Sequence, residues 1–161
     1  TNESYKESGY ALMTPPGHEH PTNLAPLRAR GAKMVLYHGV SDAIFSAEDT
    51  RRWIDALGQA LGGTSADFAR YFPVPGMNHC SGGPATDQFD LLSPLVQWVE
   101  QGVAPQAVPA TARGAGNPGG MNAELPQGWS ATRSRPLCAY PTVARYKGQG
   151  SIEDSSSFVC Q

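Results

Sequence analysis

Two short apolar runs, about thirty residues apart, give the clearest pattern along the chain. Residues Met34 to His38 are apolar or aromatic without alternation and end at Gly39, which is typical of a parallel strand buried on both faces. Residues Phe68 to Val74 alternate apolar with less apolar side chains and end at Pro75. We therefore expect two strands, one from each run.

The segment between the two runs has the pattern of an amphipathic helix. Ser46 can cap a helix end and Asp49 follows three residues later. Apolar residues then recur at helical spacing, at Trp53, Ile54, Leu57, Ala60 and Leu61. This pattern predicts a helix from about Ala47 to Leu61. A strand, a helix and a second strand in this order form a βαβ unit, so the chain belongs to the α/β class with a parallel sheet edge.

A second helix is predicted before Gly102, which is its expected C-terminal stop. Pro94 is unfavourable inside a helix, so either the helix kinks there or Ser93 caps a fresh start with Pro94 at its first position, and we favour the fresh start. Trp53 and Trp98 recur with other apolar residues and are expected in the core. The helix carries the apolar residues Phe89, Leu91, Leu92, Leu95, Val96, Trp98 and Val99.

The remaining residues are rich in Pro and Gly and show no periodicity. We expect an approach segment at 1–32, a core at 33–104 and an irregular tail at 105–161. A bridge between Cys138 and Cys160 would close a 22-residue interval and contribute about 3 kcal/mol by the loop-entropy estimate. Such a bridge would explain how a long irregular tail is ordered.

Charge and composition exclude two classes of partner. The formal net charge is -2, so nothing favours nucleic acid or an anionic membrane as a partner. No apolar run approaches the roughly 20 residues that a membrane span needs.

The chain opens with Thr1 and Asn2, without a visible targeting signal, and we expect it to be the later part of a longer precursor. Its cysteines number three, so in an oxidising compartment one lacks a partner within these residues.

The candidate chemistry follows the two predicted strands. Asp42 comes four residues after the first strand, and His79 follows the second. Loops that leave neighbouring parallel strands meet at one sheet edge, where a carboxylate can orient an imidazole as a general base. An acid followed by a histidine is the order of the second and third members of an α/β-hydrolase triad.

The nucleophile of such a triad is not found in the expected pattern. Ser41 and Ser130 both lack the closing glycine of a G-x-S-x-G turn. Two interpretations stay open at this point: the chain is not a hydrolase and Asp42 and His79 are loop-capping residues, or the serine lies on a preceding segment.

Four motifs, in order, resemble the C-terminal portion of the tannase and feruloyl esterase family. They are residues 33–46, residues 74–84, residues 98–105, and residues 135–141 with 146–148. Within the family, Phe45 with Ser46 and the run from Cys80 to Asp90 look most like bacterial members that act on mono(2-hydroxyethyl) terephthalate. The resemblance implies a secreted or periplasmic α/β-hydrolase that cleaves esters of aromatic acids.

The resemblance also implies roles for individual residues. It maps Asp42 onto the triad acid and His79 onto the triad base. It implies that Cys80 is bridged to a cysteine beside the nucleophilic serine, outside these residues, while Cys138 pairs with Cys160. It places a structural calcium ion in a lid that precedes Thr1, so no cofactor or metal is expected in this chain.

Some positions depart from the family pattern or stay open. Asn78 stands where the family usually has Gly, and Ala43 where Pro is frequent. Asn tolerates left-handed backbone better than most residues, so the loop should survive the change. Residues 109–128 look longer than their family counterpart, and the sequence suggests no function for them.

The other histidines and Phe45 each have two interpretations. His38, at a strand end, is expected to support the loop by bonding to nearby backbone rather than to do chemistry. His18 and His20 could be metal ligands, but without a third ligand nearby we expect a solvated loop. Phe45 is expected in an aromatic-acid pocket, with core packing as the alternative.

The sequence thus predicts the C-terminal part of a serine carboxylic-ester hydrolase for aromatic acid esters, such as feruloyl, galloyl or monohydroxyethyl terephthalate esters. Its partner would be the N-terminal portion that carries the serine, and neither nucleic acid nor a membrane is expected. The alternative is a non-catalytic binding or accessory module on a hydrolase scaffold. The presence or absence of that serine in the preceding segment separates the two hypotheses.

Overall fold

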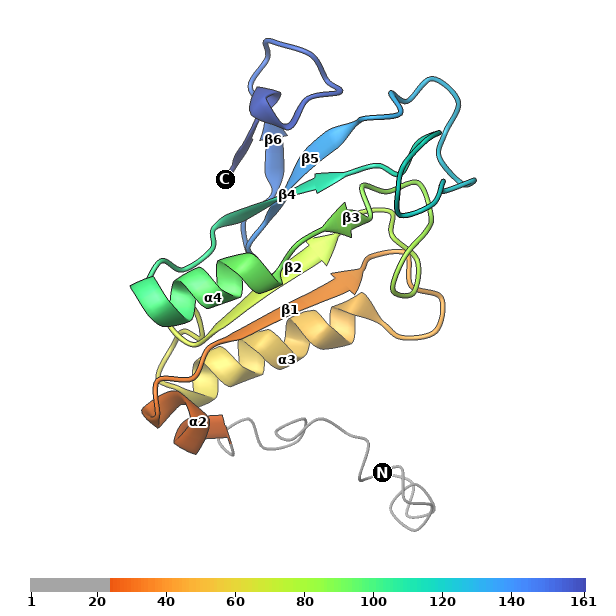
Figure 1. Cartoon of the computed structure of the whole chain (residues 1–161). Helices are drawn as coiled ribbons and strands as arrows, with labels where there is room; N and C mark the ends of the chain where they lie inside the picture. Colours follow the sequence, from red (N-terminus) through yellow and green to blue (C-terminus); the bar gives the residue numbers. More distant parts are fainter. Residues whose placement is uncertain (1–23) are drawn as a thin grey trace, which may run out of the picture.

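The computed structural model describes residues 24–161, and its centre is the predicted βαβ unit (Figure 1). Strands β1 (Met34–Gly39) and β2 (Ala69–Val74) are parallel, and helix α3 (Ala47–Ala60) connects them. A short helix, α2 (Ala25–Ala29), precedes β1. The structure confirms the α/β class and the predicted parallel pair. The predictions on His18 and His20 lie outside the described residues.

Helix α3 packs on the β1–β2 pair because one of its faces is apolar. Ile54 and Leu57 are buried on that face and contact the strands through a cluster that also contains Phe68 and Tyr71. Ser46 occupies the N-cap position as predicted, but its side chain makes no capping hydrogen bond. Trp53 is only half-buried at the margin of this cluster.

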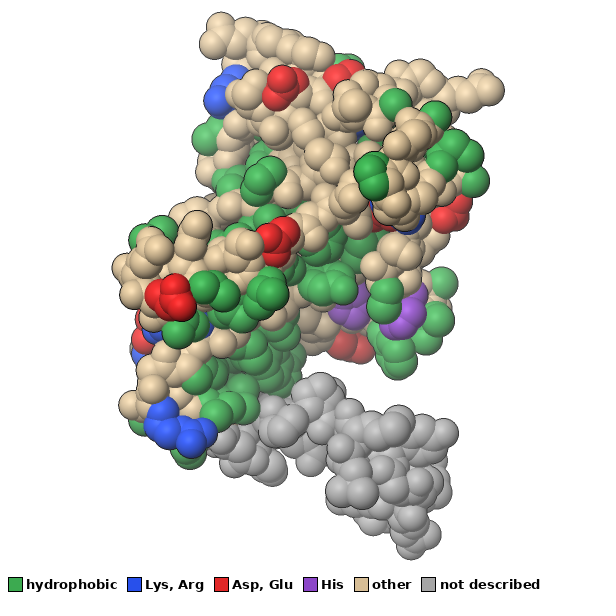
Figure 2. Space-filling model, in the orientation of Figure 1, with side chains coloured by type: hydrophobic (Ala, Val, Ile, Leu, Met, Phe, Trp, Pro, Cys, Tyr) green, Lys and Arg blue, Asp and Glu red, His purple; other side chains and the backbone are tan. Residues whose placement is uncertain are grey.

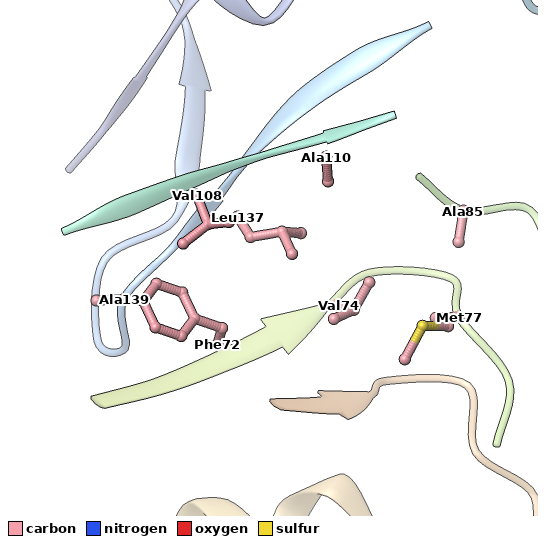
Figure 3. Packing of buried hydrophobic residues seen from close by; sticks show 8 residues of the cluster. All are labelled: Phe72, Val74, Met77, Ala85, Val108, Ala110, Leu137 and Ala139. Atoms are coloured by element: carbon pink, nitrogen blue, oxygen red, sulfur yellow. The ribbon is translucent and has the colours of Figure 1, made fainter. Parts of the chain in front are cut away.

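A second core lies on the other side of β2, against an antiparallel sheet. That sheet consists of β3 (Gln88–Phe89), β4 (Ala107–Thr111) and β5 (Ser134–Cys138). Figure 3 shows side chains from β2 and from β4 and β5 pointing toward one another. The buried cluster contains Phe72, Val74, Met77, Ala85, Val108, Ala110, Leu137 and Ala139.

The second predicted helix exists, but it begins earlier than predicted. Helix α4 (Leu92–Gln101) places Pro94 at its third position, where the first turn leaves backbone N–H groups without helical acceptors. The N-cap position is Leu91 rather than Ser93, and the preceding residue satisfies the helix end: the Asp90 carboxylate accepts hydrogen bonds from the backbone N–H of Leu92 (2.8 Å) and of Ser93 (3.1 Å). Gly102 ends the helix in a left-handed conformation, as expected.

The apolar residues predicted on the second helix have different positions and exposures. Phe89 lies in β3 rather than on the helix. Trp98 is buried, as predicted. Leu92, Val96 and Val99 are exposed, and Figure 2 shows apolar side chains gathered over α4 on the viewed face.

The tail is more regular than the sequence indicated. In addition to β4 and β5, it contains β6 (Ala144–Tyr146), a 3₁₀ turn η3 (Ser155–Ser157) and β7 (Phe158–Cys160). Strands β6 and β7 pair antiparallel. The predicted disulfide joins Cys138, at the end of β5, to Cys160, at the end of β7, with Cα atoms 5.5 Å apart. The bridge therefore fastens the last hairpin to the antiparallel sheet.

Strand β1 is less buried than its apolar sequence predicted. Its side chains are mostly half-buried, and Tyr37 is 46% exposed. Among residues 24–161, β1 pairs with β2 and with no other strand. One edge of β1 and part of its surface are therefore open within the described part of the chain.

Candidate functional site

The loops after β1 and β2 are locked against each other by backbone contacts. The N–H of Val40 donates to the carbonyl of Val74 (3.0 Å), and the N–H of Ser41 donates to the carbonyl of Met77 (3.0 Å). A side chain at Gly39 would collide with the backbone carbonyl oxygens of Met77 and Asn78, so only glycine fits. This close approach brings the two loops that carry Asp42 and His79 together.

Asp42 and His79 form a hydrogen-bonded pair at the carboxyl ends of the two strands. Nδ1 of His79 lies 2.8 Å from Oδ2 of Asp42. The Asp42 side chain is only 3% exposed, whereas that of His79 is 44% exposed. In the described part of the chain, Nε2 of His79 has no hydrogen-bond partner. The pair is thus a buried carboxylate behind an imidazole that is open on its far side, and Figure 2 shows the histidines at this end of the sheet.

The second oxygen of Asp42 is held by its own loop. Oδ1 accepts hydrogen bonds from the backbone N–H of Ile44 (2.8 Å) and of Phe45 (3.1 Å). Burial raises the pKa of Asp42, but the hydrogen bond to His79 and the two backbone N–H groups outweigh it and hold the pKa well below its usual range. The carboxylate is therefore charged at neutral pH and fixed in direction.

A second imidazole reaches the same carboxylate oxygen. Nε2 of His38 lies 3.2 Å from Oδ2 of Asp42 and 3.2 Å from the carbonyl oxygen of Phe45. Nδ1 of His38 lies 2.8 Å from the hydroxyl of Thr50 on α3. If Nε2 carries the proton, it donates toward these oxygens while Nδ1 accepts from Thr50. His38 thus bonds to loop backbone as expected and also contacts Asp42, and Thr50 is a participant that sequence reasoning missed because it lies inside the helix.

A cavity of about 580 Å³ adjoins the exposed side of His79. The ring of Phe45 lies 5.5 Å from the imidazole ring of His79, centre to centre. Phe45 is 61% exposed, so it is not part of the core. The cavity is mostly apolar and is lined by Leu36, Tyr37, His38, Gly39, Asp42, Phe45, Ser46, Asp49, Thr50, Trp53, Met77, His79 and Cys80.

Cys80 follows His79 in the chain, lines the same cavity and has an unusual backbone conformation. It is exposed and forms no disulfide within the described residues. Its φ is 65°, the left-handed region, which non-glycine residues adopt rarely. Asn78, where the sequence suggested such a conformation would be tolerated, is not among the described residues with positive φ.

Residues 24–161 contain neither a cluster of metal-ligating side chains nor a membrane-spanning helix. No group of three or more His, Cys, Asp or Glu side chains there is arranged to hold a metal ion. Within the same residues, no helix has the length and apolar character needed to cross a membrane.

Known proteins with similar sequences are esterases and a related ester hydrolase. The family model described as tannase and feruloyl esterase matches residues 17–161. The mono(2-hydroxyethyl) terephthalate hydrolase of Piscinibacter sakaiensis is 54% identical over 139 residues, which cover 86% of this chain and 21% of that protein. The probable feruloyl esterase B of Emericella nidulans is 32% identical over 155 residues, covering 86% of this chain and 28% of that protein.

Solved structures show the same relationship. The crystal structure of feruloyl esterase B from Aspergillus oryzae superposes with a TM-score of 0.65 at 29% identity, over 87% of this chain and 29% of that one. An esterase from the same organism gives a TM-score of 0.69 at 26% identity, over 86% of this chain and 29% of that one. The chain therefore spans between about a fifth and three tenths of the relatives it matches.

Proposed function

Because the chain belongs to the tannase and feruloyl esterase family, we propose that Asp42 and His79 are the acid and the base of a serine carboxylic-ester hydrolase. One observation carries this proposal: a buried carboxylate lies 2.8 Å from Nδ1 of an imidazole that is open to a cavity on its other side. A loop-capping histidine needs neither a charged partner nor an open face.

In the proposed reaction, Nε2 of His79 takes the proton of a serine hydroxyl as its oxygen attacks the ester carbonyl. The bond from Nδ1 to Asp42 stabilises the imidazolium that forms. His79 then gives this proton to the departing alcohol, leaving an acyl-enzyme. Water, activated by the same imidazole, cleaves the acyl-enzyme and releases the acid.

The serine of this reaction is proposed to lie on a portion of the protein that precedes these residues. Ser41 and Ser130 do not stand in a G-x-S-x-G turn. The open edge and half-buried surface of β1 are what a strand inside a larger parallel sheet would present to its next neighbour. The proposed catalytic unit is therefore formed by this chain together with that portion.

The proposed substrates are esters of aromatic acids. The names of the relatives include a feruloyl esterase and a mono(2-hydroxyethyl) terephthalate hydrolase, both of which act on such esters. The cavity beside His79 is consistent with them, because Phe45, Tyr37 and Trp53 offer aromatic surface against which a ring can stack. Phe45, at ring-contact distance from His79, is the proposed substrate contact.

Three accessory properties are part of the proposal. Cys80 pairs with a cysteine next to the nucleophilic serine and so ties base to nucleophile. The Cys138–Cys160 bridge supports folding in an oxidising compartment, so the protein is secreted or periplasmic. The calcium ion implied by the family belongs to the preceding lid; the described residues do not fit it, and no step above involves it.

The test compares His79→Ala with the parent in the protein that contains both this chain and the portion carrying the serine. Turnover of an aromatic ester should fall by about 10⁴-fold or more, because the serine loses its proton acceptor. Gln97→Ala, at an exposed position of α4, is the matched control and should leave turnover unchanged. A His79→Ala variant that retains a tenth of the parent turnover would refute the role of the base. Binding of aromatic esters without turnover in the parent would favour the binding module instead.

A further inference from the structure

Residues 113–124, for which the sequence suggested no role, pack on the loop that carries His79. We infer that Glu124 is a positioning residue for His79: its carboxylate fixes residues 78–83, here called the His79 loop, by holding Asn78 and the backbone of Gly83. This inference rests on the proposed function, because it assigns a role in orienting the proposed base.

The carboxylate of Glu124 contacts the His79 loop on both sides of the histidine. Before it, the side-chain amide of Asn78 donates to Oε1 (3.1 Å) and Oε2 (3.2 Å) of Glu124. After it, the backbone N–H of Gly83 donates to Oε2 of Glu124 at 2.7 Å. One side chain thus spans the loop, and the residue that precedes His79 in the chain is one of its two partners.

Glu124 is itself held in place by a buried asparagine. Oδ1 of Asn122 accepts from the backbone N–H of Glu124 (3.0 Å), and its Nδ2 donates to the carbonyl of Gly83 (2.8 Å). The backbone N–H of Asn122 donates to the carbonyl of Arg113 at 2.8 Å. The position of the Glu124 carboxylate therefore follows from a fixed turn rather than from a free surface side chain.

A buried ion pair joins the two segments at a second point. Asp87, whose side chain is fully buried, accepts from the guanidinium of Arg113 (2.6 Å) and from the backbone N–H of Gly82 (2.8 Å). Arg113 also donates to the carbonyl oxygens of Gly119 and Gly120. The neighbouring backbone N–H groups of Gly82 and Gly83 in the His79 loop thus each donate to a carboxylate, that of Asp87 and that of Glu124, respectively.

The His79 loop needs such support because its backbone adopts conformations that most residues disfavour. Cys80 holds a left-handed φ of 65°, and rare conformations of this kind persist only where surrounding contacts hold them. Gly83, at a φ of 76°, approaches the carbonyl of Gly76 too closely for any side chain. Without Glu124, the Asn78 amide and the Gly83 N–H lose their acceptor. The His79 loop then loses contacts that hold the imidazole in position to bond to Asp42.

The test measures Glu124→Ala, Glu124→Gln and Glu153→Ala in the complete enzyme. For Glu124→Ala we expect kcat to fall about 10- to 100-fold with KM within about twofold, because a displaced base weakens the chemical step but not substrate binding. Glu124→Gln keeps one acceptor oxygen and should recover kcat to within about threefold of the parent. Glu153→Ala is the control: it removes a carboxylate that bonds Arg133 and the Ser130 N–H in the tail and makes no hydrogen bond to the His79 loop, so it should leave kcat within about twofold.

Hydrogen exchange of the peptide covering residues 78–84 gives a readout that needs no activity. Glu124→Ala should speed exchange of this peptide, and Glu153→Ala should not. Unchanged exchange, or faster exchange with unchanged kcat, overturns the inference. If Glu124→Ala does not fold, Asn78→Ala removes the Asn78–Glu124 hydrogen bonds from the other side. It must lower kcat with KM unchanged, by a smaller factor than expected for Glu124→Ala. A His79→Ala variant with full turnover would refute the proposed function, which the exchange measurement does not depend on.

Discussion

Replacing Asp42 by asparagine tests whether this residue orients the base, and the structure predicts how the variant fails. The backbone N–H groups of Ile44 and Phe45 both donate to Oδ1 and would select the oxygen of the new amide. Its NH₂ group would then occupy the position of Oδ2, facing Nδ1 of His79 at the present 2.8 Å. Two donors cannot face each other, so Nδ1 must give up its proton and become an acceptor.

This tautomer change removes the base without removing the imidazole. With Nδ1 as the acceptor, the proton of neutral His79 sits on Nε2, which then cannot take a proton from the serine. We expect kcat for an aromatic ester to fall by about 10⁴-fold, as removing the correct tautomer does in a serine triad. Because the amide keeps the shape of the carboxylate and its two backbone hydrogen bonds, the fold should remain.

The assay is steady-state hydrolysis by the complete enzyme at neutral pH, alongside circular dichroism of the same samples. Asp67→Asn is the matched control, because Asp67 is an exposed carboxylate that pairs with Arg28 on α2. It should retain full activity. An Asp42→Asn variant within tenfold of the parent would refute the assignment of Asp42 as the triad acid.

Three further predictions concern ionisation and the cysteines. The pKa of Asp42 is lower in the folded protein than its unfolded value of about 3.9. The charged carboxylate therefore stabilises the fold above that pH, and this stability is lost as pH falls toward the folded pKa. In urea unfolding, the stability of Asp42→Asn should depend less on pH between about pH 4 and about pH 2 than that of the parent. Burial raises the pKa of Tyr71 to about 12, so Tyr71→Phe should remove a tyrosinate signal near that pH from an ultraviolet absorbance titration; an unchanged curve there would contradict this. Non-reducing peptide mapping of the complete protein should find Cys138 joined to Cys160 and Cys80 joined to a cysteine outside these residues; a free Cys80 thiol would refute the proposed pairing.

The βαβ unit was predictable because its signals are local. The apolar run from Met34 to His38 and the helical spacing of Ile54 and Leu57 can each be recognised within one short segment, although β1 is less buried than its run predicted. The disulfide between Cys138 and Cys160 was also foreseen, from the family resemblance. The same resemblance, together with the order of acid and histidine, pointed to the Asp42–His79 pair that the structure brings together.

The antiparallel sheet of the tail was missed because its local signals oppose a strand. Pro109 in β4 and Pro136 in β5 each suggest a break, yet they lie opposite each other in the register. A facing pair of prolines can occupy only a position where neither N–H is needed by the ladder, so the sheet tolerates both. Such compensation depends on pairing between distant segments and is invisible in either one alone.

The start of α4 and the partners of the site were missed for a related reason. Asp90 caps α4 from two residues before the helix, whereas the sequence rule favoured Ser93 because Pro94 follows it. Thr50 and Glu124 contact His38 and the His79 loop across 12 and 46 residues of sequence, respectively. Only the tertiary fold brings these side chains to the site.

We propose above that this chain supplies the base for a serine that lies outside it. The most direct measurement treats the complete protein with a fluorophosphonate, which labels an activated serine, and locates the label by peptide mass spectrometry. We expect a label on one serine outside these 161 residues, and no label when His79→Ala or Asp42→Asn is treated in the same way. A label on a serine within these residues, or labelling that survives His79→Ala, would contradict it.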